Sequence, residues 1–358
     1  QGYNRVYCNL DVVIKFGDSL NKYRKGVSML KRFAWVFICC MMVSLGYSGI
    51  VLAESSKNKL QAPLFDNLSS FYHPISTKSD IAQQFFNQGL ILFYAFESGE
   101  SIRSFREAIR LDPTCAMCYW GLALALGSKN NMPMNGNEKQ EAIEAIKKAR
   151  QYVDPKNMLE DAYIKALSKR YKSEMIVAKD ASEAFTHGAS LAENTEAIDY
   201  AAAMRDVTQQ FPKNVDAKCL YVFALFDVNK WEFFSRDGKP KPNTLEIIKT
   251  LESVLLLEPK NIAANHYYLH VIEQSPHPEQ ALANADFLRD AVPGAEHLLH
   301  MSAHIYFLMG RYQDAIDTNQ KANLAFKQYQ TDSIAKVLNQ RLIILTYITC
   351  TFFGLLRS

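Results

Sequence analysis

The feature that most constrains this chain is a 34-residue repeat in its body. Pro259 and Pro293 stand 34 positions apart, and each closes a run with helical periodicity. His266 and His300 are separated by the same 34 positions. A repeat of this length is one pair of helices that cannot bury its apolar face alone, so several pairs must stack. The sequence therefore predicts an all-α solenoid of about six or seven helical pairs.

Composition agrees with a helical chain. The 15 glycines and 12 prolines together make up about 8% of the 358 residues, below the ~12% usual in soluble proteins. This shortage argues against turn-rich sandwiches and barrels. Residues 54–358 carry 33 basic and 35 acidic side chains, and the basic ones form no cluster. Nucleic-acid binding depends on neutralising phosphates, so this class of function is excluded.

One stretch matches a known repeat position by position. Its residues stand at positions 4, 8, 20, 24, 27 and 32 of the unit and are Phe85, Gly89, Ser101, Phe105, Ala108 and Pro113. These are the large, small, small, aromatic, alanine and proline positions of the tetratricopeptide repeat. Over residues 83–326 the chain resembles the tetratricopeptide repeat family. That resemblance implies a right-handed α-solenoid whose first helices line a concave surface.

The resemblance narrows to a group of large, mostly bacterial, exported tetratricopeptide proteins of unassigned role. The segments that carry it are 115–121, 237–240, 265–273, 297–304 and 310–312. We expect the solenoid to span residues 81–328. Members of the group usually continue with further helices, whereas here an uncharged run of 15 residues follows from Leu342 to Leu356. We expect a C-terminal helix and apolar tail over residues 329–358.

Residues 29–53 have the layout of a secretory signal peptide. Lys31 and Arg32 precede an uncharged run that ends in small residues at Ala53, before polar sequence. The alternative is an uncleaved anchor helix, since 21 uncharged residues can span a bilayer. We expect a leader over 1–28, a polar linker over 54–80, and an exported, periplasmic or secreted protein that meets the membrane only through an uncleaved signal.

Cys115 and Cys118 are the two cysteines that lie close together beyond Ala53. In an oxidising compartment they could form a redox-active or structural disulfide, or hold a soft metal. Two small apolar residues at a helix start are the alternative. Tyr119 follows them where haem attachment requires a histidine, so a c-type haem is excluded.

Six of the eight histidines fall within 39 residues, and such crowding needs a physical reason. At 100° per residue, His266, His270 and Glu273 share one face of a helix. His300 and His304 repeat the two histidine positions one unit later. Imidazoles from two packed helices can reach one ion at about 2.0 to 2.1 Å. The sequence therefore predicts a transition-metal site, with Zn first and Cu, Ni or Fe open, because imidazole suits all four.

Each member of the cluster has an expected role. The favoured ligands are His266, His270, His300 and His304. Glu273 could be a fifth ligand, an orienting group, or a general base for a metal-bound water, and His297 is expected to orient a ligand. The alternatives are contacts to a peptide, a response to pH, or simple packing. His277, His73 and His187 are expected to take no part.

The other expected concave positions are apolar, and an apolar groove leading to the histidines could bind an extended or helical segment. Its residues are Phe86, Leu90, Phe93, Trp120, Phe223 and Phe226. The alternative is that these side chains form the core. The acidic residues, in contrast, are scattered and are expected on solvated faces.

Together these features predict an exported binding scaffold for a protein or peptide ligand, with a metal site in its last repeats. One alternative is a metal-dependent hydrolase or oxidoreductase in which Glu273 handles the proton. A second alternative is a metal-free interaction module. Fold alone cannot choose among the three.

Overall fold

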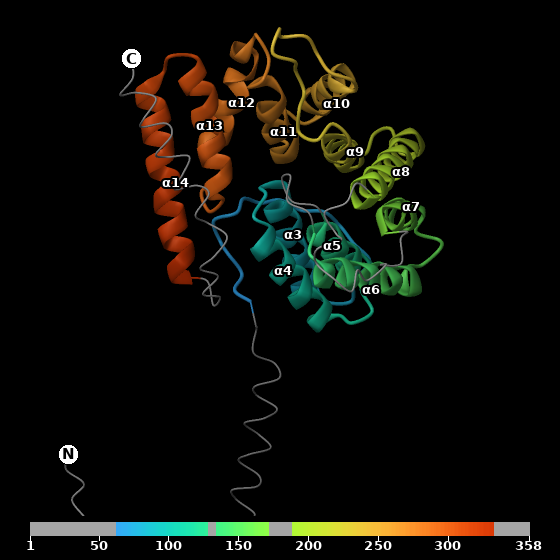
Figure 1. Ribbon diagram of the computed structural model, residues 1–358. Coiled ribbons are helices and arrows are strands. Elements are labelled where there is room, and N and C mark those ends of the chain that lie inside the picture. The colour runs from blue at the N-terminus through green and yellow to red at the C-terminus, as the bar shows by residue number, and fades with distance from the viewer. Residues whose placement is uncertain (1–61, 128–133, 172–187, 333–358) are drawn as a thin grey trace, which may run out of the picture. The chain divides into compact units, whose positions relative to one another are not determined.

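Figure 1 shows a computed structural model of the chain, which describes residues 62–127, 134–171 and 188–332. The expected leader, the signal peptide and the apolar run 342–356 lie outside these residues. Within them the chain forms 12 α-helices and no β-strand, apart from one isolated bridge between Phe234 and Pro240. The predicted all-α class is confirmed.

The helices follow one another as six consecutive pairs, which agrees with the expected six or seven. They are α3 (Asp80–Tyr94) and α4 (Ser98–Leu111), α5 (Ala116–Leu126) and α6 (Gly136–Tyr152), α7 (Met158–Ser168) and α8 (Gly188–Gln210), α9 (Val215–Val228) and α10 (Thr244–Leu257), α11 (Ile262–Ile272) and α12 (Leu282–Ala291), α13 (Glu296–Leu308) and α14 (Tyr312–Asp332). Short 3₁₀ turns follow α7 and precede α12.

Asparagine side chains start several of these helices. Asn157, Asn214 and Asn261 each precede the first helix of a pair, and each accepts a hydrogen bond from the backbone N–H three residues on. Such caps satisfy an amide that the helix itself leaves without a partner. The start of each of these helices is therefore encoded locally.

The packing between the first helices is that of a tetratricopeptide-like array. Gly89 of α3 and Gly121 of α5 both face the ring of Phe105 on α4, and a Cβ atom added at these glycines would lie 2.8 and 2.3 Å from that ring. Only glycine leaves room for helices to approach an aromatic ring this closely. The small and aromatic positions of the repeat pattern thus have the roles that the pattern predicts.

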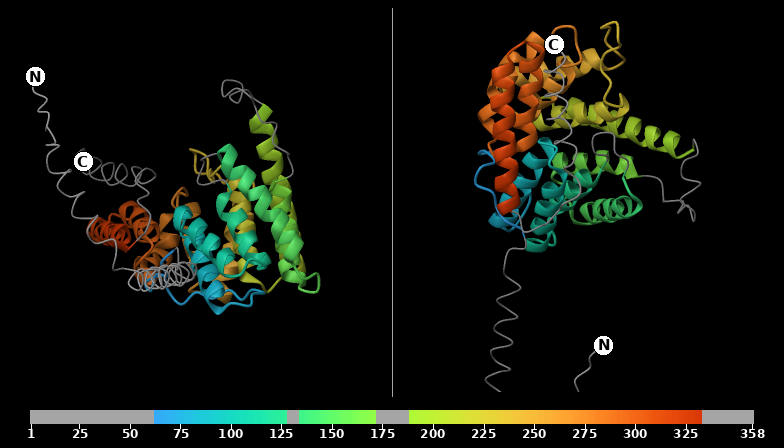
Figure 2. Two further views of the ribbon diagram at one scale, coloured as in Figure 1. Left: turned by 90° about the horizontal axis from the view of Figure 1, so that it is seen from below. Right: turned by 60° about the vertical axis from the view of Figure 1, so that its left-hand side comes forward.

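The array curves so strongly that its first helix packs against later ones (Figures 1 and 2). The ring of Phe93 on α3 lies 4.8 Å from that of Phe223 on α9. One residue on, the ring of Tyr94 lies 6.3 Å from that of Tyr267 on α11. The inner face of the later pairs is therefore covered by α3.

This closure corrects the expectation of an open apolar groove. Every one of the six side chains assigned to it is at most 6% exposed: Phe86, Leu90, Phe93, Trp120, Phe223 and Phe226. They pack against one another and against α3, and so they belong to the core. The physical reason is that burying this apolar surface within the chain stabilises the closed array.

Residues 62–79, expected as part of a polar linker, instead form an ordered strap along the helices. The backbone N–H of Gly294 donates to the Asn67 carbonyl at 2.9 Å, and the backbone N–H of Ser76 donates to Glu160 at 2.6 Å. Between them, Nδ1 of His73 lies 2.6 Å from a carboxylate oxygen of Asp216. The strap thus ties α7, α9 and the α12–α13 turn together.

A helix needs about 20 predominantly apolar residues to cross the hydrocarbon core of a bilayer. Within residues 62–127, 134–171 and 188–332, no helix is long and apolar enough to cross a membrane.

Candidate metal centre

Three histidines from two helices point their Nε2 atoms at one another. Nε2 of His270 lies 3.1 Å from Nε2 of His266, its neighbour on α11, and 3.4 Å from Nε2 of His297 on α13. All three ligand nitrogens lie within 4.8 Å of one another. We call these three residues the histidine triad.

Two of the nitrogen separations in the triad, 3.1 and 3.4 Å, are close to those between the ligands of one metal ion. A tetrahedral ion bound at about 2.05 Å places its ligand nitrogens about 3.3 Å apart. Neutral imidazoles bring lone pairs together at this distance only if a cation or a proton lies between them. The triad therefore brings together three groups that could hold one metal ion.

The other ring nitrogen of two triad members is held by an acceptor. Nδ1 of His266 donates to the backbone carbonyl of Tyr94 at 2.6 Å, and this oxygen can only accept. Nδ1 of His270 lies 3.2 Å from a carboxylate oxygen of Glu273. Both rings are thereby held in the tautomer with the proton on Nδ1, which leaves the Nε2 lone pair for a metal.

A second pair of histidines repeats this arrangement on α13. Nε2 of His304 lies 3.0 Å from Nε2 of His300. Nδ1 of His304 donates to the other carboxylate oxygen of Glu273 at 2.6 Å, and Nδ1 of His300 lies 2.7 Å from Oδ1 of Asn319 on α14. We call His300 and His304 the histidine pair. Glu273 thus joins the triad to the pair.

Glu273 is an ionised carboxylate. Burial by itself raises its pKa, but the hydrogen bonds from His270 and His304 outweigh burial and lower that pKa to about 2. Its two oxygens face the Nδ1 atoms of His270 and His304 at 3.2 and 2.6 Å, which is the geometry of an orienting group. Among the three roles considered for it, the geometry fits the orienting one.

The histidines that are most enclosed stay neutral. Burial, followed by the neighbouring His270, lowers the pKa of His266 well below its usual value. The pKa of His297 is lowered in the same way, by burial and then by His266. Burial and the neighbouring His304 lower the pKa of His300 to about 4. Neutral imidazole is the form that binds metal, so protons compete weakly at these positions.

Two aromatic residues from loops enclose the triad. The ring of Phe96, just after α3, lies 4.4, 5.4 and 5.3 Å from the rings of His266, His270 and His297. Trp231, after α9, lies 5.7 Å from His270. Phe96 and Trp231 both have a left-handed backbone, with φ of 61° and 59°, which is costly for bulky side chains and is typical of functional sites.

The structure regroups the six residues predicted for the centre. The four favoured ligands divide between two clusters: His266 and His270 lie in the triad, and His300 and His304 form the pair. His297, expected to orient a ligand, instead lies in the triad with its Nε2 facing that of His270. The reason is that α11 and α13 meet with His297 opposite His270, a relation that sequence spacing within one helix cannot reveal.

Several contributors to the site were not predicted. Tyr94, Phe96 and Asn319 come from α3, the loop after it, and α14. Trp231, in the segment between α9 and α10, packs over His270. No pattern in the sequence indicates these contacts, because they join residues up to 172 positions apart.

The remaining candidates are placed as follows. Cys115 and Cys118 form a disulfide at the N-terminus of α5, where both are buried. The His277 side chain is 62% exposed beside Glu279, as a solvated turn residue should be. His73 is buried against Asp216, away from the triad and the pair. His187 lies outside the described residues.

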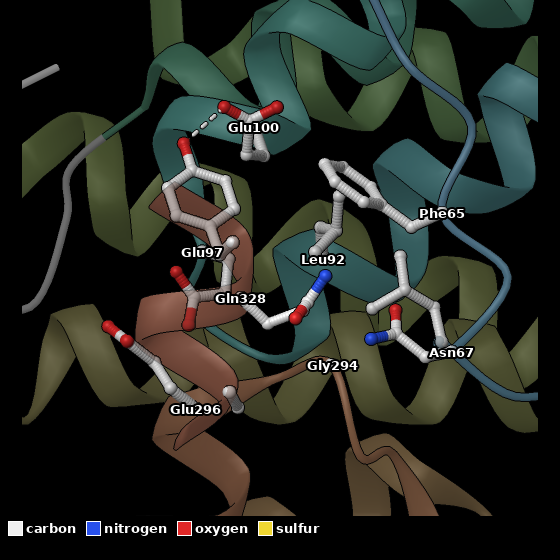
Figure 3. A pocket seen from close by; sticks show the side chains of 11 residues that line it. Phe65, Asn67, Leu92, Glu97, Glu100, Gly294, Glu296 and Gln328 are labelled. Carbon is white, nitrogen blue, oxygen red and sulfur yellow. Dashed lines mark hydrogen bonds between the residues drawn. The ribbon is translucent and has the colours of Figure 1, made fainter. Parts of the chain in front are cut away.

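A separate pocket lies where the strap, the start of α4 and the end of α14 meet (Figure 3). Phe65 and Leu92 form apolar walls, and Tyr329 donates to the carboxylate of Glu100. Glu100 and Glu296 are only 3% and 5% exposed, so the expectation that acidic residues occupy solvated faces is wrong for these two. Their burial results from α14 returning to the first pair, which the sequence does not indicate.

No family model matches this chain, and no curated protein matches it. Among solved structures it resembles one described as "MamA RS-1 ArsTM double mutant". The two sequences are 10% identical, the match covers 72% of this chain and 100% of that chain, and the TM-score is 0.33. At this level of likeness the fold assignment rests on the helix packing described above.

Proposed function

We propose that this protein is an exported, tetratricopeptide-like binding scaffold that holds a transition-metal ion on the histidine triad, with Zn²⁺ as the first choice. His266, His270 and His297 are the ligands, and Glu273 and the Tyr94 carbonyl orient two of them. The scaffold role follows from the helical-repeat architecture, which typically presents surfaces to protein or peptide partners. We also propose that the protein is related to the large, mostly bacterial, exported tetratricopeptide proteins that its sequence resembles.

The observation that carries the metal proposal is the convergence of three Nε2 atoms, with acceptors at the Nδ1 atoms of two of the three rings. Nδ1 of His266 and Nδ1 of His270 face acceptors at 2.6 and 3.2 Å, so their lone pairs face inward. Histidines that ligate metals almost always show this kind of support. With both Nδ1 atoms protonated, the Nε2 lone pairs would repel each other at 3.1 and 3.4 Å unless a cation or a shared proton lay between them, and a metal ion would supply that cation.

Export is supported by two independent features. Residues 29–53 follow the charged, apolar and small-residue order of a signal peptide. The disulfide between Cys115 and Cys118 fits an oxidising compartment, where such bonds persist.

A metal-dependent hydrolase is the second candidate function. Three protein ligands leave a fourth coordination position, as in catalytic zinc sites, whereas structural sites have four protein ligands. A bound ion would supply Lewis acidity and lower the pKa of a coordinated water. Glu273 would hold His270 and His304 in place rather than act as the base, because both of its oxygens already accept hydrogen bonds.

Elemental analysis by plasma mass spectrometry tests the proposal. The protein is purified without a His tag or chelator, and Zn²⁺ binding is measured by competition with a chromophoric chelator. We expect the double variant His266→Ala/His297→Ala to lose triad binding. His277→Ala is the matched control, because this exposed histidine lies outside the centre. Unchanged Zn²⁺ affinity in a folded double variant would overturn the triad as the site.

A further inference from the structure

We propose that the histidine pair, His300 and His304, binds a second metal ion, so that the centre is binuclear. This inference deepens the proposed function and rests on it, because the two positions share Glu273. It departs from the sequence-based expectation of one ion held by four histidines from both helices. The ion expected at the pair is a divalent ion that accepts square-planar or octahedral geometry, namely Cu²⁺ or Ni²⁺.

As in the triad, oxygen acceptors hold the Nδ1 atoms of the two histidines in the pair. Each Nδ1 faces an oxygen acceptor: Glu273 for His304 at 2.6 Å and Asn319 for His300 at 2.7 Å. The two Nε2 atoms then meet at 3.0 Å. Acceptors behind both rings orient the Nε2 lone pairs toward a common point, the arrangement that makes imidazoles metal ligands.

The separation of the two nitrogens selects a coordination geometry. With bonds of about 2.05 Å, nitrogens 3.0 Å apart subtend an angle of about 94° at the ion. That is the angle between adjacent ligands in a square or an octahedron, and it is far from the linear arrangement of two-coordinate Cu(I). The triad separations, 3.1 and 3.4 Å, correspond to about 98° and 112°, so the second is near the tetrahedral angle and the first lies between that angle and 90°.

The pair and the triad are distinct sites rather than one shared site. Among the described residues, the convergent group of three ligands contains His266, His270 and His297 and neither member of the pair. His300 and His304 are held on the α14 side by Asn319, whereas His266 is held on the α3 side by Tyr94. Each cluster therefore has its own supports, and Glu273 is the group common to both.

Glu273 also makes a second ion electrostatically acceptable. Two divalent ions repel each other, and a buried carboxylate between their ligands offsets part of that repulsion. The site nevertheless gains four positive charges against one negative charge. The second ion should therefore bind more weakly than the first, and we expect the pair, which offers two histidine nitrogens among the described residues, to be the weaker position.

The test is metal stoichiometry in two complementary double variants. The triad variant His266→Ala/His297→Ala is titrated with Cu²⁺, and the pair variant His300→Asn/His304→Gln with Zn²⁺, each beside the wild type. We expect two equivalents in the wild type and one in each variant. The triad variant should show a tetragonal Cu²⁺ signal with two nitrogen ligands by electron paramagnetic resonance. Circular dichroism shows whether each variant folds. If a double variant does not fold, the single variant His297→Gln or His304→Gln is used in its place.

The outcomes separate this inference from the proposed function. One equivalent in the wild type that survives in the pair variant overturns the second site and leaves the triad intact. One equivalent that either variant abolishes means a single shared ion and overturns the binuclear centre. Wild-type protein that takes up no metal overturns both the inference and the metal function.

Discussion

Nδ1 of His266 on α11 donates to the backbone carbonyl of Tyr94 at the end of α3, at 2.6 Å and across 172 residues of sequence. The bond links the fifth helix pair to the first. It also orients a member of the histidine triad. The candidate metal centre therefore depends on the same closure that buries the inner face of the array.

Glu273 links the two histidine clusters, so its charge should matter to metal affinity. Glutamine keeps the size of the side chain but replaces one acceptor oxygen with an NH₂ donor, so His270 or His304 loses its acceptor. We expect Glu273→Gln to weaken Zn²⁺ binding about 10- to 100-fold. Competition with a chromophoric chelator measures the change. Glu279→Gln, beside the exposed His277, is the control and should bind normally; equal affinity in both variants would remove Glu273 from this role.

The close approach of α3 and α5 to Phe105 should make two glycines irreplaceable. A methyl group at Gly121 would meet the ring at 2.3 Å, and one at Gly89 at 2.8 Å. We expect each alanine variant to lose about 1 to 3 kcal/mol of unfolding free energy through overpacking. Gly99→Ala in α4 is the matched control, because nothing lies within 4 Å of its added Cβ. Urea denaturation measures all three, and equal stability at the three positions would contradict this packing.

Asp112 should make stability depend on pH through its ties to the strap. Burial by itself raises its pKa, but hydrogen bonds from Lys78, Thr77 and Thr114 lower it to about 2, below the usual 3.8. A carboxylate with a lowered pKa stabilises the folded state above its unfolded-state pKa, and this contribution is lost as pH falls through the folded-state value. The lowering of the Asp112 pKa from 3.8 to about 2 corresponds to about 2 kcal/mol of unfolding free energy.

We therefore expect Asp112→Asn to be less stable than the wild type near neutral pH by about that amount. The difference should shrink as pH falls from about 4 to about 2, where the wild-type carboxyl is protonated too. Urea denaturation over this range gives the difference directly. A difference that stays constant with pH would show that the charge of Asp112 has no part in the effect.

The disulfide between Cys115 and Cys118 should resist reduction while the protein is folded. Both residues are at most 1% exposed, so a small thiol reaches the bond only after local opening. We expect the peptide carrying both cysteines to remain unlabelled by maleimide after native treatment with dithiothreitol, and to be labelled after the same treatment in urea. Peptide mass spectrometry reads the result. Rapid labelling of the native protein would instead indicate an exposed, exchange-competent pair.

Much of the local structure was predictable because its causes are local. The helical spacing of apolar residues and the small and aromatic positions of one repeat predicted the helix pairs and the packing of Gly89 on Phe105. The strap was missed, since its polar composition indicates a linker and its partners, such as Asp216, are remote.

The sequence alone determined that this chain forms stacked helix pairs and that its histidines gather on two consecutive first helices, because periodicity and spacing act over a few turns. Only the tertiary structure decided which nitrogens face each other. His297 joins His266 and His270 because α11 and α13 pack with His297 opposite His270. Tyr94 and Phe96 reach the triad because α3 covers the inner face. Long-range packing minimises exposed apolar surface over the whole array, and no local pattern records its outcome.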